Sequence, residues 1–380
     1  MRWKTRAIAM VVIVVLMAVS FVIPVSAISD EEVAAPSAIL MEPNTGKILY
    51  EKNANELRPC ASITKVMTLL LVMEAIDSGK ISLDDQVTAS AHAASMGGSD
   101  IWLKEGETMS VNDLIKATVI MSANDAAVVL AEHVYGTEDE FVKQMNIRAK
   151  QLGMNDTTFK NCNGLDEDGH LTTAHDVALM SAELIKHEKI FDYTLTWMDY
   201  VRDGETQLVN TNKLIRSYKG ITGLKTGTTS QAGSCISATA KRDNLSLVAV
   251  VLGCSTTDER FTSASTLLDY GFANFSFASL QMPELGTVPV TNGIQGEVQA
   301  ECTATAEVLF PKGKESAIKS EVELSEGVQA PVEQGQLLGK VKYELDGEVI
   351  AEYDITAKNS VKELDFGASF MILLRSLFHW

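Results

Sequence analysis

Apolar residues recur at helical spacing through much of the first half of the chain. The strongest run is ended by Gly79 and has apolar positions at i, i+3 and i+4: Val66, Leu69, Leu70, Met73 and Ile76. So much of this segment is apolar that the pattern predicts a helix nearly surrounded by protein. Further helices are predicted from about Ser110, directly after residues 122–125, and over 137–152 and 172–189.

Strand patterns occur on both sides of these helices. Residues 37–53 predict two short strands around the turn at 43–46. From about Gly220 three further strand-like runs follow, with a hairpin turn at 241–244, and a last helix over 259–275 would cover them. Strands from both ends of the region with helices between them predict a mixed α and β domain over residues 28–275.

The remainder of the chain has a different pattern. Residues 286–361 alternate in the manner of short strands with turns, which predicts a small separate β domain over 276–361. The final segment, 362–380, carries an apolar stripe: Phe366, Phe370, Leu373, Leu374 and Leu377. A helix over the last 15 residues is shorter than the roughly 20 that a membrane span needs. We therefore expect an amphipathic helix in the membrane interface, the alternative being a helix docked on the β domain.

The first 27 residues have the three parts of an export signal. Arg2, Lys4 and Arg6 precede an apolar stretch over 7–23, and small residues lie at 25–27. We predict a cleaved signal peptide over 1–27, with an uncleaved membrane anchor as the alternative. The protein would then work outside the cytoplasm, at the extracytoplasmic face of the cytoplasmic membrane.

Composition excludes several classes of protein. Hydrophobic residues make up 46% and charged residues 22%, as in a globular protein with a substantial core. The formal net charge of −18 argues against nucleic-acid binding. The five cysteines lack C-x-x-C spacing and are expected to be mostly buried. No H-E-x-x-H motif is present, and His170 and His175 are interpreted as structural, so we expect no metal and no cofactor.

The first candidate for chemistry is the pair Ser62 and Lys65 at the start of the apolar helix. A serine there is commonly an N-cap, but a lysine one turn later opposes the helix dipole. Residues at i and i+3 share a helix face, so the amine can reach the hydroxyl. Burial would lower the pKa of that amine, and the neutral amine could then activate Ser62 as a nucleophile. A second S-x-x-K, Ser316 to Lys319, lies in the strand-rich region and is interpreted as solvated surface.

Two further motifs complete the set. Ser122-Ala123-Asn124 lies in a break between two helical runs, where both polar residues are either helix caps or groups that point into a cleft. Lys225-Thr226-Gly227 lies on a predicted strand. Because Gly227 has no side chain, a ligand backbone could lie against that strand edge, with the lysine and threonine offered to an anionic group.

The order S-x-x-K, S-x-N, K-T-G resembles that of the penicillin-binding proteins and serine β-lactamases. The whole chain is most similar to the low-molecular-weight D-alanyl-D-alanine carboxypeptidases, on the segments RPCASITKVMT, MSANDAA, GLKTGTTSQAG and ERFTSASTLLDYGF together with both termini and the β domain. The resemblance implies an α+β catalytic domain, with an antiparallel sheet flanked by helices, and a small C-terminal all-β domain. It implies peptidoglycan stem peptides and β-lactams as the ligands.

The resemblance also implies roles for the residues. Ser62 would be the nucleophile that the penultimate D-alanine acylates, and Lys65 its general base. Ser122 would pass a proton to the leaving D-alanine, helped by Lys225, while Asn124 orients the peptide.

Other residues would bind the end of the peptide. Lys225, Thr226 and Arg260 would hold its terminal carboxylate beside Gly227. The backbone N–H groups of Ser62 and Thr228 would form the oxyanion hole.

Two residues depart from the family pattern. Thr228 stands where several relatives have His, and Cys60 stands where Pro is frequent.

Rival functions remain open at this stage. A β-lactamase of class A would need an E-x-x-L-N segment between Asn124 and Lys225, and none occurs. A non-catalytic protein that binds stem peptides is disfavoured by the three intact motifs. A transpeptidase is disfavoured by the small size of the chain.

Overall fold

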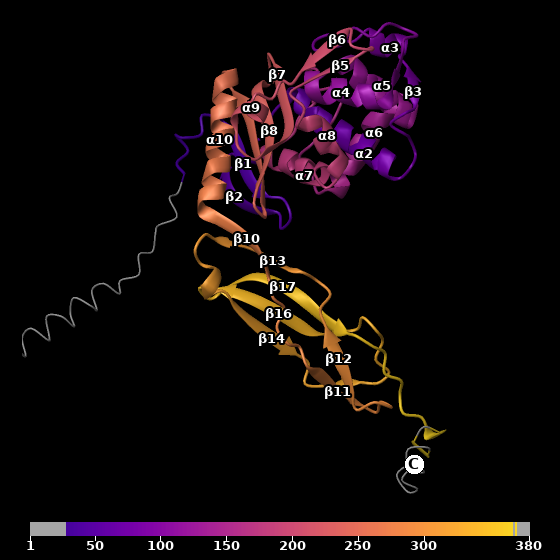
Figure 1. Cartoon of the computed structure of the whole chain (residues 1–380), viewed down its shortest axis with the longest axis vertical. Coiled ribbons are helices and arrows are strands. Elements are labelled where there is room, and N and C mark those ends of the chain that lie inside the picture. Colours follow the sequence, from indigo (N-terminus) through magenta and orange to yellow (C-terminus); the bar gives the residue numbers. More distant parts are fainter. Residues whose placement is uncertain (1–27, 368, 371–380) are drawn as a thin grey trace, which may run out of the picture.

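The computed structural model describes residues 28–367, 369 and 370, and Figure 1 shows the arrangement of the elements. The predicted signal peptide and most of the predicted C-terminal helix therefore lie outside the described residues. Within the described part of the chain, no helix has the length and apolarity needed to cross a membrane.

The predicted catalytic part of the fold is organised around a five-stranded antiparallel sheet. Its strand order is β2-β1-β9-β8-β7, so β7 lies at one edge. The five strands are β1 (Ser37–Glu42), β2 (Lys47–Lys52), β7 (Ile221–Thr229), β8 (Gly233–Arg242) and β9 (Leu245–Cys254). The strands predicted from both ends of this region thus join in one sheet, as the expected fold class requires.

Both faces of the sheet are buried, which explains why β9 is almost continuously apolar. Val248, Val250 and Leu252 belong to the core beneath the helical body, while alternate residues of the same strand belong to the core beneath α10 (Thr257–Asn274). Figure 1 shows α10 on one side of the sheet and the main group of helices on the other. A capping box between Thr256 and Glu259 fixes the start of α10.

The helical body contains the apolar helix predicted first. It begins with a 3-10 turn, η1 (Ala61–Thr64), and continues as α2 (Lys65–Asp77), which is buried on nearly every side. The other helices of this body are α3 (Ala91–Ala94), α4 (Val111–Lys116), α5 (Asn124–Tyr135), α6 (Glu138–Gln151), α7 (Ala174–Leu184), η3 (Glu188–Ile190) and α8 (Phe191–Thr194). The short α9 (Leu214–Ser217) instead packs in the core on the α10 side of the sheet. The helix expected over 172–189 therefore ends at Leu184.

Two small two-stranded sheets in the helical body were not predicted. They are β3 (Gln86–Thr88) with β4 (Thr108–Ser110), and β5 (Met198–Val201) with β6 (Thr206–Val209). Both consist of very short strands, too short for a clear alternation in the sequence.

The C-terminal part is an all-β unit with its own hydrophobic core. It contains a two-stranded sheet, β10 (Phe275–Leu280) with β13 (Ala306–Pro311), and a six-stranded sheet in the order β14-β16-β17-β12-β11-β15. The remaining elements are β11 (Thr287–Thr291), β12 (Glu297–Glu301), η4 (Glu315–Ala317), β14 (Lys319–Leu324), β15 (Val328–Gln329), β16 (Leu337–Leu345) and β17 (Glu348–Ala357). This architecture agrees with the predicted small all-β domain.

Candidate active site

Lys65 connects three separate segments of the chain at the start of α2. Its side chain is fully buried, and its Nζ donates to Ser62 Oγ at 3.0 Å, to Asn124 Oδ1 at 2.6 Å and to the backbone oxygen of Asn163 at 2.7 Å. Ser62 caps neither η1 nor α2, because no side-chain capping bond is present at either. The N-cap interpretation of Ser62 is therefore wrong, and its hydroxyl faces the lysine amine.

Burial changes the acidity of this amine. Desolvation lowers the pKa of Lys65 to about 7, opposed by the carboxylate of Asp125. Near neutral pH the charged and uncharged forms are therefore similarly populated. The uncharged form can accept a proton from a hydroxyl 3.0 Å away.

Ser122 and Asn124 are presented by a break between α4 and α5. After α4 the chain forms a π-helical turn, η2 (Ala117–Met121), and then places Ser122 in the left-handed region at φ 66°. The N-cap of α5 is Ala123, without a side-chain bond, so the capping interpretation of Ser122 and Asn124 is also wrong. Asn124 instead bridges Lys65 and the backbone oxygen of Gly97, at 2.7 Å from its Nδ2.

Ser122 is a buried hydroxyl without a hydrogen-bond partner among the described residues. A buried polar atom left unpaired is costly, and such atoms occur at sites built for a ligand or a reaction.

The edge strand β7 carries the third motif. Lys225 is buried, and its Nζ donates to the backbone oxygen of Thr226 at 3.0 Å. Desolvation, Lys65 and Arg260 hold the pKa of Lys225 well below its usual range. Thr226 Oγ1 donates to Thr211 Oγ1 at 2.7 Å.

Gly227 is required for a different reason from the one expected. A Cβ at this position would lie 2.8 Å from the backbone oxygen of Cys60 and 2.9 Å from the nitrogen of Ser62. The missing side chain therefore makes room for the start of η1 rather than for a ligand backbone. This close approach places β7 directly beside Ser62.

Arg260 reaches β7 from α10 behind the sheet edge. Its Nη1 donates to Gly227 O at 3.1 Å and to Thr228 Oγ1 at 2.9 Å, and the residue is 6% exposed. The guanidinium thus supports the backbone at 227 and 228 and adds a positive charge behind it.

Sequence reasoning missed the loop over residues 161–171. The backbone oxygen of Asn163 accepts a hydrogen bond from Lys65. Gly164 has φ +87°, and a Cβ on it would lie 2.0 Å from the backbone oxygen of Ala61. At its other side, Asp166 accepts from Thr229 Oγ1 at 2.6 Å, just after the K-T-G motif. The loop therefore joins the nucleophile turn to β7. Its Asn-Gly and Asp-Gly dipeptides signal turns, but nothing in them indicates this partner.

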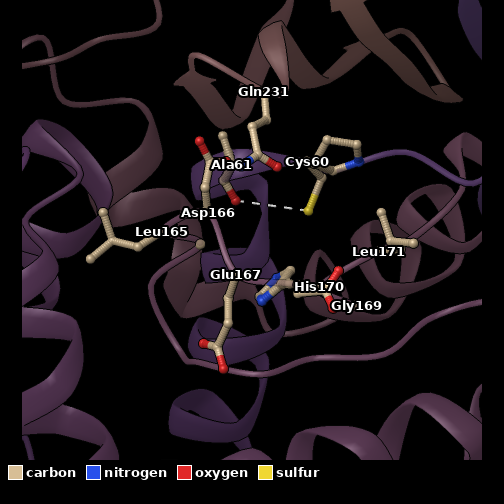
Figure 2. Close-up of a pocket in the computed structure, with 12 residues that line it drawn as sticks. Cys60, Ala61, Leu165, Asp166, Glu167, Gly169, His170, Leu171 and Gln231 are labelled. Carbon is tan, nitrogen blue, oxygen red and sulfur yellow. Dashed lines mark hydrogen bonds between the residues drawn. The ribbon is translucent and has the colours of Figure 1, made fainter.

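A small pocket of about 100 Å³ lies between this loop and residues 59–61, and Figure 2 shows its lining. His170 belongs to this lining and is held in a hydrogen-bond chain. Its Nδ1 accepts from Lys160 N at 3.2 Å, so its Nε2 carries the proton and donates to Thr64 Oγ1 at 2.8 Å. Burial lowers the pKa of His170 to about 4, which agrees with a neutral structural histidine.

The cysteines are free thiols, four of them buried. Burial raises the pKa of Cys60 to about 12, so this thiol, two residues before Ser62, is unreactive. Within the described residues, no group of three or more His, Cys, Asp or Glu side chains is placed to hold a metal ion.

Comparison with known proteins identifies the family. Residues 24–256 match the D-alanyl-D-alanine carboxypeptidase family (Peptidase_S11), and residues 282–363 match the penicillin-binding protein 5 C-terminal domain. The D-alanyl-D-alanine carboxypeptidase DacF of Bacillus subtilis is 43% identical over 352 residues, which cover 91% of this chain and 90% of that protein.

Solved structures agree with this result. Penicillin-binding protein 5 from Haemophilus influenzae aligns with a TM-score of 0.82 and 32% identity, covering 89% of this chain and all of that one. Penicillin-binding protein D2 from Listeria monocytogenes in its ampicillin-bound form aligns with a TM-score of 0.58 and 36% identity, over 63% of this chain and 98% of that one. The chain belongs to the D-alanyl-D-alanine carboxypeptidase family and is a serine hydrolase of the penicillin-binding fold.

The contact between Gly164 and Ala61 yields a testable prediction. Gly164→Ala should lower the free energy of unfolding for two reasons. Alanine at positive φ costs roughly 1 kcal/mol, and the clash with Ala61 should add about 1–3 kcal/mol. Gly136→Ala is the matched control, because Gly136 has φ +84° and open space at its Cβ position. Chemical denaturation of both variants measures the difference. An equal loss of unfolding free energy in the two variants would show that the loop moves away from Ala61 without a cost in stability.

Proposed function

We propose that the protein removes the terminal D-alanine from peptidoglycan stem pentapeptides through an acyl-enzyme on Ser62, and that penicillin inhibits it. The observation that carries this proposal is the 3.0 Å contact between Ser62 Oγ and the amine of Lys65, whose pKa is lowered to about 7. The family assignment supports the reaction class.

The first half of the reaction forms an ester. Ser62 Oγ attacks the carbonyl carbon of the penultimate D-alanine and transfers its proton to the neutral Lys65 amine. The negative charge that develops on the carbonyl oxygen is held by the N–H groups of Ser62 and Thr228. Each such donor typically contributes about 3 kcal/mol to the barrier reduction.

Collapse of this intermediate breaks the C–N bond. The leaving D-alanine amine takes a proton that Ser122 passes on, helped by Lys225, and the proton that Lys65 took from Ser62 replaces it on Ser122. Water then attacks the ester carbonyl, and the proton it loses returns to Ser62 as the shortened peptide leaves.

The anionic end of the substrate is recognised on β7. Lys225 and Thr226 bind the terminal carboxylate, and Arg260 adds positive charge behind them. Asn124 orients the peptide, while Gly227 keeps β7 close to Ser62. Thr228, in place of the His of several relatives, offers only a hydroxyl beside its backbone donor.

We also propose the location and the domain limits from the sequence. The protein is exported by residues 1–27, works at the extracytoplasmic face of the cytoplasmic membrane, and is held there by the amphipathic segment 362–380. Between them lie the catalytic domain, residues 28–275, and the β domain, residues 276–361.

The nucleophile is tested by covalent labelling. Ser62→Ala should abolish labelling by fluorescent penicillin and the release of D-alanine from a pentapeptide ending in D-Ala-D-Ala. Ser316→Ala is the matched control, because it removes the exposed serine of the second S-x-x-K sequence. Mass spectrometry of the peptide and gel fluorescence measure both activities. Persistent labelling of the Ser62 variant would remove Ser62 as the nucleophile.

The role of Lys65 as a base is tested by pH. Only the uncharged amine accepts a proton, so the rate of acylation by penicillin should rise with pH through an inflection near 7, the pKa of Lys65. Stopped-flow measurement at limiting penicillin, which reports the pKa of the free enzyme, gives this profile. Lys65→Arg should lose acylation, whereas Lys225→Arg should keep a rate that rises with pH but move its inflection below 7, because a permanent charge at position 225 opposes one on Lys65. The measured range should run from about pH 5 to about pH 9, roughly two units either side of the inflection. A rate that does not change over this range would contradict the proposal.

The membrane proposal is tested by truncation. Removal of residues 366–380 should shift the protein from the membrane pellet to the soluble fraction and leave D-alanine release intact, because apolar burial in the interface is lost. Fractionation and an activity assay measure both. A truncated protein that stays in the pellet would point to an uncleaved N-terminal segment.

A further inference from the structure

A second cleft lies between the segment around Trp102 and the β5–β6 hairpin. It has a volume of about 630 Å³. Its wall is Trp102, which is 72% exposed and is the largest exposed apolar side chain of the catalytic part. Charged side chains complete the lining: Lys104, Glu105, Glu107, Arg202 and Glu205.

The exposure of Trp102 is enforced by the fold. Its backbone is left-handed, with φ +55°, a conformation that a bulky residue adopts only when its surroundings require it. The N–H groups on both sides of it, of Ile101 and Leu103, donate to the buried carboxylate of Asp125 at distances from 2.9 to 3.2 Å. Arg202 Nη1 holds the oxygen of Ile101 at 2.9 Å. The indole is thus presented at the top of a rigid arch.

This arch is continuous with the candidate active site. Asp125 is the residue after Asn124, and the N–H of Asn124 donates to Ser99 O at 2.7 Å. Ser99 Oγ donates in turn to Met121 O, next to Ser122, at 2.6 Å. The segment that presents Trp102 is therefore anchored on the same turn that carries Ser122 and Asn124.

The lining of the cleft combines one aromatic face with many polar groups. Arg202 is fixed by Glu107 at 2.6 Å through Nε, while its Nη2 makes no contact among the described residues. Glu105, Glu205 and Lys104 are exposed at the rim. An indole face accepts the C–H face of a pyranose ring, and the surrounding donors and acceptors match its hydroxyl groups. An apolar peptide side chain would contact the indole but would use none of the exposed charged groups at the rim.

We propose that Trp102 and Arg202 form a saccharide subsite, which binds a sugar ring of the glycan to which the stem peptide is attached. The inference rests on the proposed function. Trp102 would then make the enzyme prefer peptides that still carry their glycan over free peptides.

The test compares two substrates of the full-length protein. One is the free pentapeptide that ends in D-Ala-D-Ala, and the other is the same pentapeptide on its disaccharide. The wild-type kcat/KM should favour the disaccharide form roughly tenfold, the range expected for one aromatic contact. Trp102→Gly, which suits the positive φ, should bring this ratio close to one through a higher KM for the disaccharide form. Trp102→Phe should restore part of it.

Tyr200→Ala is the matched control, because Tyr200 is an exposed aromatic residue, 48% accessible, on the neighbouring hairpin and outside the cleft. It should keep the wild-type ratio. A wild-type ratio of one, a ratio that Trp102→Gly leaves unchanged, or an equal loss on both substrates, which would indicate a peptide contact, would each overturn the subsite. If the wild type releases D-alanine from neither substrate, the proposed function fails and the inference fails with it.

Discussion

The structure depends on one buried amine. Lys65 has no contact with water and no carboxylate partner among the described residues, so its hydrogen bonds must offset the desolvation of its charged form. It has three N–H groups when charged and three acceptors at 2.6 to 3.0 Å, on Ser62, Asn124 and Asn163. These acceptors come from three segments, so a single side chain fixes the nucleophile, the S-A-N turn and the 161–171 loop relative to one another.

Backbone contacts fix the same region from two sides. The turn around Ser62 is approached by β7 at Gly227 and by the loop at Gly164, and at each position a Cβ would collide with the backbone. Backbone placed against backbone leaves less freedom than side-chain packing, because there are no rotamers to change. The hydroxyl of Ser62 is thereby held within reach of the amine before any ligand arrives, which is the condition for a preorganised site.

The sequence predicted the parts of this site that rest on local patterns. Helical spacing located the start of α2, and strand alternation located β7, because both signals lie within about ten residues. The link from Lys65 to Asn163 joins residues 98 apart, and no local pattern carries it. The left-handed conformation of Ser122 follows a π-helical turn over residues 117–121, and nothing in the sequence of these residues predicts such a turn. From the sequence alone, Ser122 and Asn124 could therefore equally have been helix caps. Gly227 was singled out for the approach of a ligand backbone, but the structure shows at this position a contact with η1 that only the tertiary fold creates.

The basic side chains of the site influence one another's protonation, and this coupling indicates when Lys65 is uncharged. Lys65, Lys225 and Arg260 lie close enough that Lys65 and Arg260 lower the pKa of Lys225, and none of the three has a carboxylate ion pair within the described residues. A protein of net charge −18 thus keeps three basic side chains together without a carboxylate counter-ion among its described residues. A bound carboxylate would supply that counter-charge and raise the pKa of Lys225, which favours its charged form. The proton on Lys225 then opposes one on Lys65, because two neighbouring cations titrate as a coupled pair. Binding of the anionic end would in this way leave Lys65 uncharged, the form in which it can accept the proton of Ser62.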